Sequence, residues 1–145
     1  MKILLFGGTG QLGRKVLDEA LKKNLKVTAV CRSPEKLSDK INKNLVVIKG
    51  DALHLNMIEE HFKEKDVIVS CLGEYKLPFF TVTLYSEFTK QAIERVHKYH
   101  IKKLIVCSSS GTVPSERYRM TFLARWVFVP LIGSVLSNMY MMEKI

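Results

Sequence analysis

The residues with the clearest chemical potential are four glycines gathered in one short stretch near the amino terminus. The run from Leu4 to Gly13 reads LLFGGTGQLG and joins an apolar segment to a segment of helical period. Small residues let a backbone approach a diphosphate, and the unpaired amides at the start of the following helix point at its negative charge. The GxxGxxG spacing is a weak signal alone, but a preceding strand, a following helical stripe (Leu12, Val16, Ala20) and a second strand strengthen it. The run therefore predicts a dinucleotide site, with an ordinary glycine turn as the alternative.

Positive charge follows the second predicted strand, where folds of this kind distinguish the two nicotinamide cofactors. An acidic residue there would bind the ribose hydroxyls of the adenosine half, but this chain offers Arg32, Ser33 and Lys36. A guanidinium, a hydroxyl and an ammonium suit a 2′-phosphate. We therefore expect NADP(H) to be preferred over NAD(H). The alternative is that Arg32 and Lys36 are ordinary surface charges and that Glu35 reaches a ribose.

Three further polar or glycine-containing clusters follow predicted strands: 49–52, 70–73 and 108–111. The carboxylate of Asp51 can accept a hydrogen bond from an adenine amino group, and Gly73 allows close passage of a nicotinamide. Each cluster alone would be an ordinary turn. Because the carboxyl ends of parallel strands meet at one edge of a sheet, we expect all of them on one rim together with the glycine loop.

Short apolar runs alternate with longer segments of helical period, which predicts a βαβ architecture. The expected strands are 2–6, 26–30, 45–48, 67–71 and 103–107, rich in Val, Ile and Leu as strands covered on both faces should be. A strong helical stripe runs from Tyr85 to Tyr99, whereas the helices over 34–40, with Ser33 as cap and Pro34 in the first turn, and over 54–62 are short. Right-handed crossovers then give an α/β, Rossmann-like doubly wound parallel sheet in the order 3-2-1-4-5.

The composition is that of one globular domain spanning residues 1–145. Apolar residues make up 47% and charged residues 26% of the 145 residues, and the excess of 23 Lys and Arg over 14 Asp and Glu is spread along the chain. An excess of positive charge that is spread along the chain argues against a nucleic-acid module. It favours a phosphate-rich small ligand, or it reflects no more than a lysine-rich proteome. The start of the chain is too short for a secretory signal, so we expect a cytoplasmic location.

Three cysteines each follow an apolar run, and no cluster has the spacing of a metal site. Cys31, Cys71 and Cys107 form no CxxC motif, so we expect reduced thiols and no bound metal, with a minor redox role as the alternative.

With these motifs in order, the chain resembles the NAD(P)H-binding branch of the atypical short-chain dehydrogenase/reductases, which includes flavin reductase (biliverdin-IXβ reductase) and NmrA-like proteins. The resemblance covers residues 1–111. It implies that Thr9 to Leu12 hold the pyrophosphate, Arg32 the 2′-phosphate, Asp51 and Ala52 the adenine, and Leu72 and Gly73 the nicotinamide ribose. It also implies that Ser109 is the active-site serine. The full set of expected cofactor contacts is Gly7, Gly8, Thr9, Gly10, Gln11, Leu12, Gly13, Arg32, Lys36, Asp51, Ala52, Leu72, Gly73 and Ser108.

Beyond Gly111 the resemblance weakens, because the strands and helix that close the substrate pocket in the relatives are absent, and we expect a truncated carboxyl-terminal part. The tail still contains YxxxK at Tyr140 and Lys144, which a helix places on one face. In the wider superfamily this pair donates a proton as hydride arrives. The spacing is common by chance and recurs at Tyr99 and Lys103, so Ser109 is the stronger catalytic candidate and Tyr140 and Lys144 are weaker ones.

The apolar stretch 120–136 is too short and too interrupted to span a bilayer, because Arg125 and Pro130 break it. We expect it to pack on the sheet, to lie beside the substrate, or to form the surface for a homodimer or a partner chain.

These features predict an NADPH-dependent oxidoreductase that transfers a hydride to a small-molecule acceptor, such as a flavin, quinone, tetrapyrrole or carbonyl compound. One alternative is a non-catalytic NADP(H)-binding redox sensor that acts through a protein partner. Another is an inactive amino-terminal fragment of a longer reductase.

Overall fold

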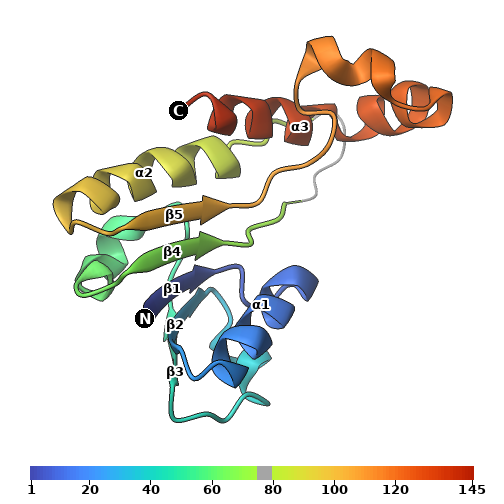
Figure 1. Ribbon diagram of the computed structural model, residues 1–145. Coiled ribbons are helices and arrows are strands. Elements are labelled where there is room, and N and C mark those ends of the chain that lie inside the picture. The colour runs from blue at the N-terminus through green and yellow to red at the C-terminus, as the bar shows by residue number, and fades with distance from the viewer. Residues whose placement is uncertain (75–79) are drawn as a thin grey trace. The chain divides into compact units, whose positions relative to one another are not determined.

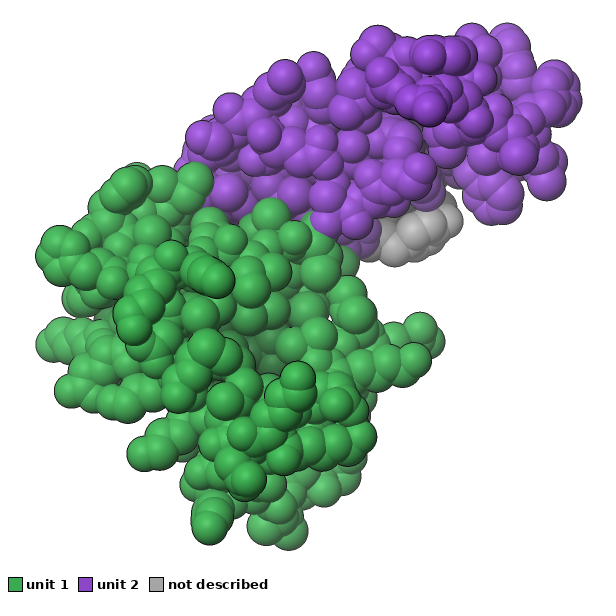
Figure 2. Space-filling view, viewed as in Figure 1, with its two compact units in different colours: residues 1–73, 91–107 green, residues 74–90, 108–145 purple. Residues whose placement is uncertain are grey.

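The computed structural model describes residues 1–74 and 80–145, which divide into two compact units (Figure 2). Unit 1 comprises residues 1–73 and 91–107, and unit 2 comprises residues 74–90 and 108–145. The strands are β1 (Lys2–Phe6), β2 (Lys26–Cys31), β3 (Leu45–Lys49), β4 (Val67–Ser70) and β5 (Lys103–Val106). The longer helices are α1 (Gln11–Lys22), α2 (Leu84–Lys98) and α3 (Val129–Glu143), and the shorter ones are η1 (Pro34–Leu37), η2 (Leu55–Phe62), η3 (Pro114–Arg119) and η4 (Ala124–Phe128).

Unit 1 contains a five-stranded parallel sheet in the order β3-β2-β1-β4-β5 (Figure 1). β1 lies in the centre, with Phe6 paired to Val30 on one side and to Ser70 on the other. The chain crosses from β3 to β4 on the far side of β1, so the winding direction reverses between β1 and β4. The predicted fold class and strand order are confirmed.

The ends of the elements differ from the sequence prediction by small amounts. β2 and β3 each run one residue further, whereas β4 and β5 each end one residue earlier, so that Cys71 and Cys107 follow their strands. The predicted helices over 34–40 and 54–62 are the short 3-10 segments η1 and η2. Pro34 does start η1 and Ser33 stands at its N-cap position, but the Ser33 side chain makes no capping hydrogen bond.

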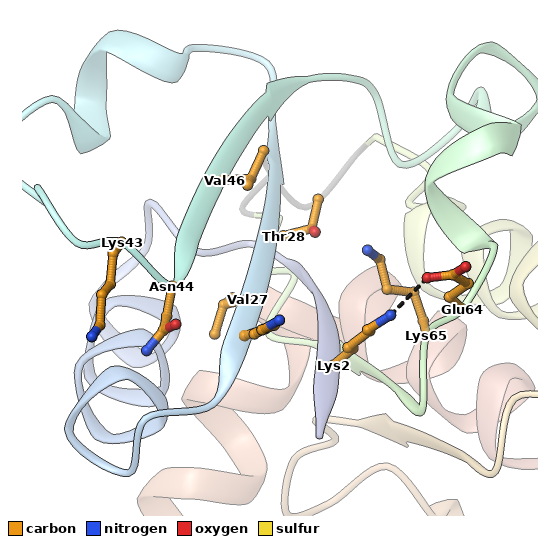
Figure 3. A pocket seen from close by; sticks show the side chains of 9 residues that line it. Lys2, Val27, Thr28, Lys43, Asn44, Val46, Glu64 and Lys65 are labelled. Atoms are coloured by element: carbon orange, nitrogen blue, oxygen red, sulfur yellow. Dashed lines mark hydrogen bonds and ion pairs between the residues drawn. The ribbon is translucent and has the colours of Figure 1, made fainter.

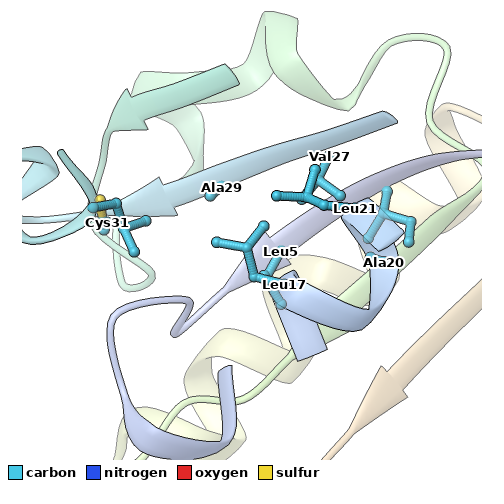
Figure 4. Close-up of a cluster of buried hydrophobic side chains, with 9 residues drawn as sticks. Leu5, Leu17, Ala20, Leu21, Val27, Ala29 and Cys31 are labelled. Atoms are coloured by element: carbon cyan, nitrogen blue, oxygen red, sulfur yellow. The ribbon is translucent and has the colours of Figure 1, made fainter. Parts of the chain in front are cut away.

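One face of the sheet is covered by α1 (Figure 4). The prediction that Leu12 belongs to the buried stripe of this helix is wrong, because its side chain is 51% exposed. The buried face instead runs through Gly13, Leu17, Ala20 and Leu21. Gly13 has no side chain, so the first turn of α1 lies close against the glycine loop and Leu12 turns outward. The cluster under α1 comprises Ile3, Leu5, Leu17, Ala20, Leu21, Val27, Ala29, Cys31 and Leu37.

The other face of the sheet is linked to η2 and to the carboxyl-terminal half of α2 by aromatic contacts and one carboxylate. The rings of Phe6 and Phe62 lie 6.3 Å apart, and Phe62 stacks on Tyr99 at the same distance. Glu59 accepts hydrogen bonds from Arg95 (3.0 Å), Lys98 (2.8 Å) and the Tyr99 hydroxyl (2.9 Å). Their hydrogen bonds and charges hold the pKa of the Glu59 carboxyl below its ordinary value. These contacts complete a two-sided core for the central strands.

Unit 2 is built around the packing of α3 against the start of α2. Asn138 of α3 is buried, and its side-chain oxygen accepts hydrogen bonds from the backbone amides of Tyr85 (2.9 Å) and Ser86 (3.2 Å). Its amide nitrogen donates to the Ser86 hydroxyl at 2.7 Å. The first-turn amides of α2 are therefore satisfied by a side chain 52 or more residues away. In residues 1–74 and 80–145 we find no helix with the length and apolar character needed to cross a membrane.

Candidate functional site

The glycine loop leaves β1 through a backbone conformation that requires glycine. Gly7 has a φ of +76°, and a Cβ placed on it would lie 2.4 Å from the carbonyl oxygen of Cys71. Both the dihedral angle and the contact exclude other residues. The loop therefore lies directly against the backbone that follows β4, at the point where the winding of the sheet reverses.

Gly13 brings the first turn of α1 equally close to the loop. A Cβ on Gly13 would lie 2.0 Å from the carbonyl oxygen of Gly7, and Gly10 closes the turn with a 3.1 Å hydrogen bond from its amide to the same oxygen. Gly10 is the N-cap of α1, with no capping bond from a side chain and no acidic residue in the first turn. The amides of Gln11 and Leu12 are therefore available to an anionic ligand, and the helix dipole favours negative charge there.

Two cations lie at the carboxyl end of β2. The side chains of Arg32 and Lys36 are exposed, and neither forms an ion pair within the part of the chain that the structure describes. Unpaired cations near a diphosphate cradle can bind a further phosphate. Glu35, the alternative group for a ribose hydroxyl, is exposed beside them.

Arg14, which the sequence prediction missed, fixes this cationic segment to α1. Its guanidinium binds the carboxylate of Asp39 at 3.0 Å and donates to the backbone carbonyl of Lys36. The hydrogen bond from Arg14 holds the pKa of the Asp39 carboxyl below its ordinary value. Because the partners are 25 and 22 residues apart, no local spacing in the sequence indicates this clamp.

The segment after β3 packs tightly at Gly50 against side chains of β2 and η2. A Cβ on Gly50 would lie 2.8 Å from Val30 and 2.9 Å from Ile58, so a larger residue there would require these side chains to shift. One carboxylate oxygen of Asp51 accepts a 3.0 Å hydrogen bond from the amide of Leu53, whereas no hydrogen bond to Oδ2 is found among the described residues. Ala52 is buried beside it. Asp51 is thus oriented and keeps one oxygen for a further donor.

Leu72 and Gly73 follow β4 at the same edge of the sheet. Leu72 is half-buried and Gly73 is exposed, and a Cβ on Gly73 would meet no atom within 4 Å. Unlike Gly7 and Gly13, this glycine is not required by packing among the described residues. It leaves open space beside the glycine loop.

In unit 2, the serines after β5 lie beside the end of α3. Ser108 donates a hydrogen bond to the Glu143 carboxylate, which also accepts from the hydroxyl of Thr112 at 3.1 and 3.2 Å. Ser109 is exposed, and its hydroxyl donates to the carbonyl of Ser110 at 3.3 Å. A hollow of about 510 Å³ is lined by Ser110, by Gly111 and by residues of the segment from Glu116 to Ala124.

The tail residues Tyr140 and Lys144 do lie on one face of the end of α3, as their spacing predicts. The Lys144 ammonium lies 5.4 Å from the centroid of the Tyr140 ring, which is a cation–π contact. Among the described residues, the group that unit 2 brings together with Ser108 is Glu143, which the sequence prediction missed. Its partners lie 31 and 35 residues earlier, beyond the reach of any local pattern.

A separate pocket lies at the opposite, amino-terminal edge of the sheet (Figure 3). It has a volume of about 290 Å³ and is lined in part by Lys2, Lys26, Lys43 and Lys65. Lys2 is paired with Glu64 at 2.6 Å, and the pKa of Lys65 is lowered by burial and by the charge of Lys2. This pocket is distant from the glycine loop along the strands and contains none of the predicted site residues.

The geometry of unit 1 fits a dinucleotide. Its edge combines a cradle that a Cβ would fill, free amides at a helix start, unpaired cations one strand away and an oriented carboxylate two strands away. Features of these kinds can bind phosphates and an adenine. In residues 1–74 and 80–145, no group of three or more His, Cys, Asp or Glu side chains is placed to hold a metal ion.

Residues 7–144 match the model of a protein family described as NAD(P)H-binding.

Solved structures with the same fold include several oxidoreductases. The oxidoreductase ylbE from Lactococcus lactis superposes with a TM-score of 0.76 at 14% identity, covering 99% of this chain and 61% of that one. ChuY, an anaerobilin reductase from Escherichia coli O157:H7, gives a TM-score of 0.73 at 20% identity over 99% and 66%. Yeast methylglyoxal/isovaleraldehyde reductase Gre2, complexed with NADPH, gives 0.76 at 15% over 99% and 51%. The chain thus spans between about half and two thirds of the length of these proteins, and at these identities the likeness shows the fold.

Proposed function

Because the chain belongs to the NAD(P)H-binding family, as the match over residues 7–144 shows, we propose that it is an NADPH-dependent reductase. The acceptor would be a flavin, a quinone, a tetrapyrrole or a carbonyl compound. The observation that carries this proposal is the cradle formed by Gly7 and Gly13, whose close backbone contacts leave a helix start free for a diphosphate. The reductases among the structural neighbours, one of them complexed with NADPH, support the same class of reaction.

Each part of the cofactor has a candidate partner in unit 1. The amides from Thr9 to Leu12 would hold the pyrophosphate, and Arg32 with Lys36 would neutralise the 2′-phosphate. The free oxygen of Asp51 would accept from the adenine amino group, with Ala52 beside it. A Cβ on Gly73 would meet no atom within 4 Å, so Leu72 and Gly73 leave room for the nicotinamide ribose. When bound, the cofactor supplies the hydride from its nicotinamide ring.

The residues proposed for the acceptor belong to unit 2. The hydroxyl of Ser109 is exposed and bonded only weakly to a neighbouring carbonyl, so it can turn to donate to an oxygen of the acceptor. Tyr140 is the candidate proton donor, with Lys144 above its ring to stabilise negative charge on the phenol. Ser108, which donates a hydrogen bond to Glu143, is a further candidate cofactor contact.

Cofactor preference is tested by comparing NADPH and NADH affinities in the wild type and in Arg32→Ala. Loss of a charge-assisted phosphate contact should weaken NADPH binding by about ten- to a hundredfold and leave NADH binding unchanged. Lys43→Ala is the matched control, because it removes the same charge at the opposite edge of the sheet. Equal loss for both cofactors in Arg32→Ala, or tighter wild-type binding of NADH, would refute the assignment.

Catalysis is tested by NADPH consumption with flavin, quinone and dicarbonyl acceptors. Ser109→Ala should lower kcat while leaving the affinity for NADPH unchanged, since Ser109 is assigned to the acceptor. Ser110→Ala is the control, because Ser110 is also exposed and follows Ser109 in the chain. Turnover that is unchanged in Ser109→Ala would remove this serine from the mechanism.

A sensor that binds NADP(H) without turnover is the second candidate, and one observation favours it. Phe122, Trp126 and Phe128 are between 54% and 78% exposed in unit 2. Exposed aromatic side chains in a group are typical of surfaces that bind another protein. Tight NADPH binding without consumption of any acceptor, together with association that Trp126→Ser abolishes, would favour the sensor over the enzyme.

A further inference from the structure

Two of the three cysteines come together at the edge of the sheet that carries the glycine loop. Cys71 follows β4 and Cys107 follows β5, and these strands are neighbours in parallel register, with Ser70 paired to Val106. The next pair in this register is Cys71 with Cys107. The amide of Cys107 donates to the carbonyl of Ser70 at 3.2 Å, so the pairing continues to the cysteines.

The spacing of the two strands suits a bond between the two sulfurs. Neighbouring strands lie about 4.8 Å apart, which falls inside the range of Cα separations that disulfides span. Paired residues of a parallel register direct their side chains to the same face of the sheet. Both cysteines are free thiols and half-buried, whereas Cys31, two strands away, is buried.

The two thiols interact with one another as well. Burial, and then the charge and the hydrogen bond of Cys107, raise the pKa of the Cys71 thiol to about 11. The same causes place the two sulfurs within reach of one another, as a bond between them requires.

We propose that Cys71 and Cys107 form a redox-active dithiol that a peroxide converts to an intramolecular disulfide. The thiolate form of one of the two cysteines attacks one oxygen of hydrogen peroxide and breaks the O–O bond, which leaves a sulfenic acid on that cysteine and releases hydroxide. The sulfur of the other cysteine then attacks the sulfenic acid sulfur, loses its proton and displaces the hydroxyl group as water. Overall the two thiols lose two electrons and two protons, and the peroxide becomes two water molecules.

The disulfide would act on the glycine loop through the backbone of Cys71. The Cys71 amide donates to the Phe6 carbonyl at 2.9 Å, and the Cys71 carbonyl oxygen lies where a Cβ on Gly7 would be 2.4 Å away. A shift of Cys71 toward β5 therefore changes the packing of Gly7. This consequence rests on the proposed function, because it predicts that oxidation weakens cofactor binding, on the order of tenfold.

The experiment uses the Cys31→Ser chain, in which Cys71 and Cys107 are the remaining thiols. Hydrogen peroxide should remove both thiols without forming dimers, dithiothreitol should restore them, and peptide mapping should find the two cysteines cross-linked. Adding Cys71→Ser or Cys107→Ser should abolish the cross-link. Persistence of both thiols, a bond between chains, or irreversible oxidation of either sulfur would overturn the proposal.

A second measurement separates this proposal from the proposed function. Phenylarsine oxide, which bridges neighbouring thiols, should bind the reduced Cys31→Ser chain and be released by a small dithiol, and it should not be held by either additional variant. NADPH affinity is then measured before and after oxidation. An unchanged affinity would overturn the link to the glycine loop. Absence of NADPH and NADH binding by the reduced chain would refute the proposed function, while the thiol counts decide the dithiol by themselves.

Discussion

Replacing Gly13 with alanine sets two physical effects against each other within one helix. In the interior of a helix, alanine is favoured over glycine by about 1 kcal/mol, so propensity alone predicts a more stable protein. The structure predicts the opposite, because the new Cβ would lie 2.0 Å from the Gly7 carbonyl oxygen and 2.7 Å from the Gly7 carbonyl carbon. Both are backbone atoms and cannot rotate away as a side chain would.

The size of the effect follows from this contact. The loop and the helix must separate by about 1 Å to reach a tolerable distance, and overpacking of this kind costs about 1–3 kcal/mol, which outweighs the gain in propensity. After the gain in propensity is subtracted, we expect Gly13→Ala to lower the free energy of unfolding by up to about 2 kcal/mol. The displaced loop should also bind NADPH more weakly, by about tenfold for each 1.4 kcal/mol of phosphate contact that is lost.

Urea unfolding and NADPH fluorescence titration measure the two effects, and Gly133→Ala is the matched control. Gly133 lies inside α3, and a Cβ on it would meet no atom within 4 Å, so there the propensity gain should prevail and stability should rise. Cofactor affinity should stay that of the wild type in the control. If Gly13→Ala is stabilised as much as Gly133→Ala and binds NADPH normally, the close contact between loop and helix is not what holds the cradle.

Three further substitutions test side chains within one unit or the other. Asn138→Ala leaves two buried amides of α2 without a partner and should lower the free energy of unfolding by about 2–4 kcal/mol in urea titrations, whereas the exposed neighbour Ser137→Ala should change it little. The amide of Lys2 and the Lys102 ammonium lower the pKa of Asp66, so the ionised carboxylate stabilises the fold above the unfolded pKa and this stabilisation is lost as pH falls through the lower folded pKa. Asp66→Asn should therefore have a lower free energy of unfolding than the wild type at pH 7, and the two values should converge under acid. Parallel pH profiles of the two proteins would contradict this. Burial and the charge of Lys2 lower the pKa of Lys65, so the fold disfavours its charged form. Lys65→Met should therefore raise the free energy of unfolding by no more than about 0.5 kcal/mol, which thermal unfolding would record as a slightly higher midpoint. A lower midpoint would show that the ammonium is stabilising.

The elements of unit 1 were predictable, and a candidate site could be assigned to one edge of its sheet, because the causes are local. Apolar runs of four to six residues identify strands, the glycine spacing marks a turn that favours glycine, and right-handed crossovers reduce the possible strand orders to a few, of which β3-β2-β1-β4-β5 is the one observed. Arg32, Asp51 and Gly73 could be placed at one edge for the same reason, since each follows a strand of a parallel sheet.

Contacts between distant parts of the chain were decided by the tertiary structure alone. Arg14 binds Asp39, Glu143 accepts from Ser108, Asn138 caps α2, and Cys71 stands beside Cys107, and none of these pairs lies within one turn or one strand. The outward turn of Leu12 belongs to the same class, because it results from how Gly13 lies against Gly7 and not from the period of the helix. Periodicity and spacing specify which face of an element is apolar, but the partner that a polar group meets depends on the register and docking of whole elements. The sequence by itself thus determined the fold and where the site is expected, and packing between elements determined which polar groups contact one another.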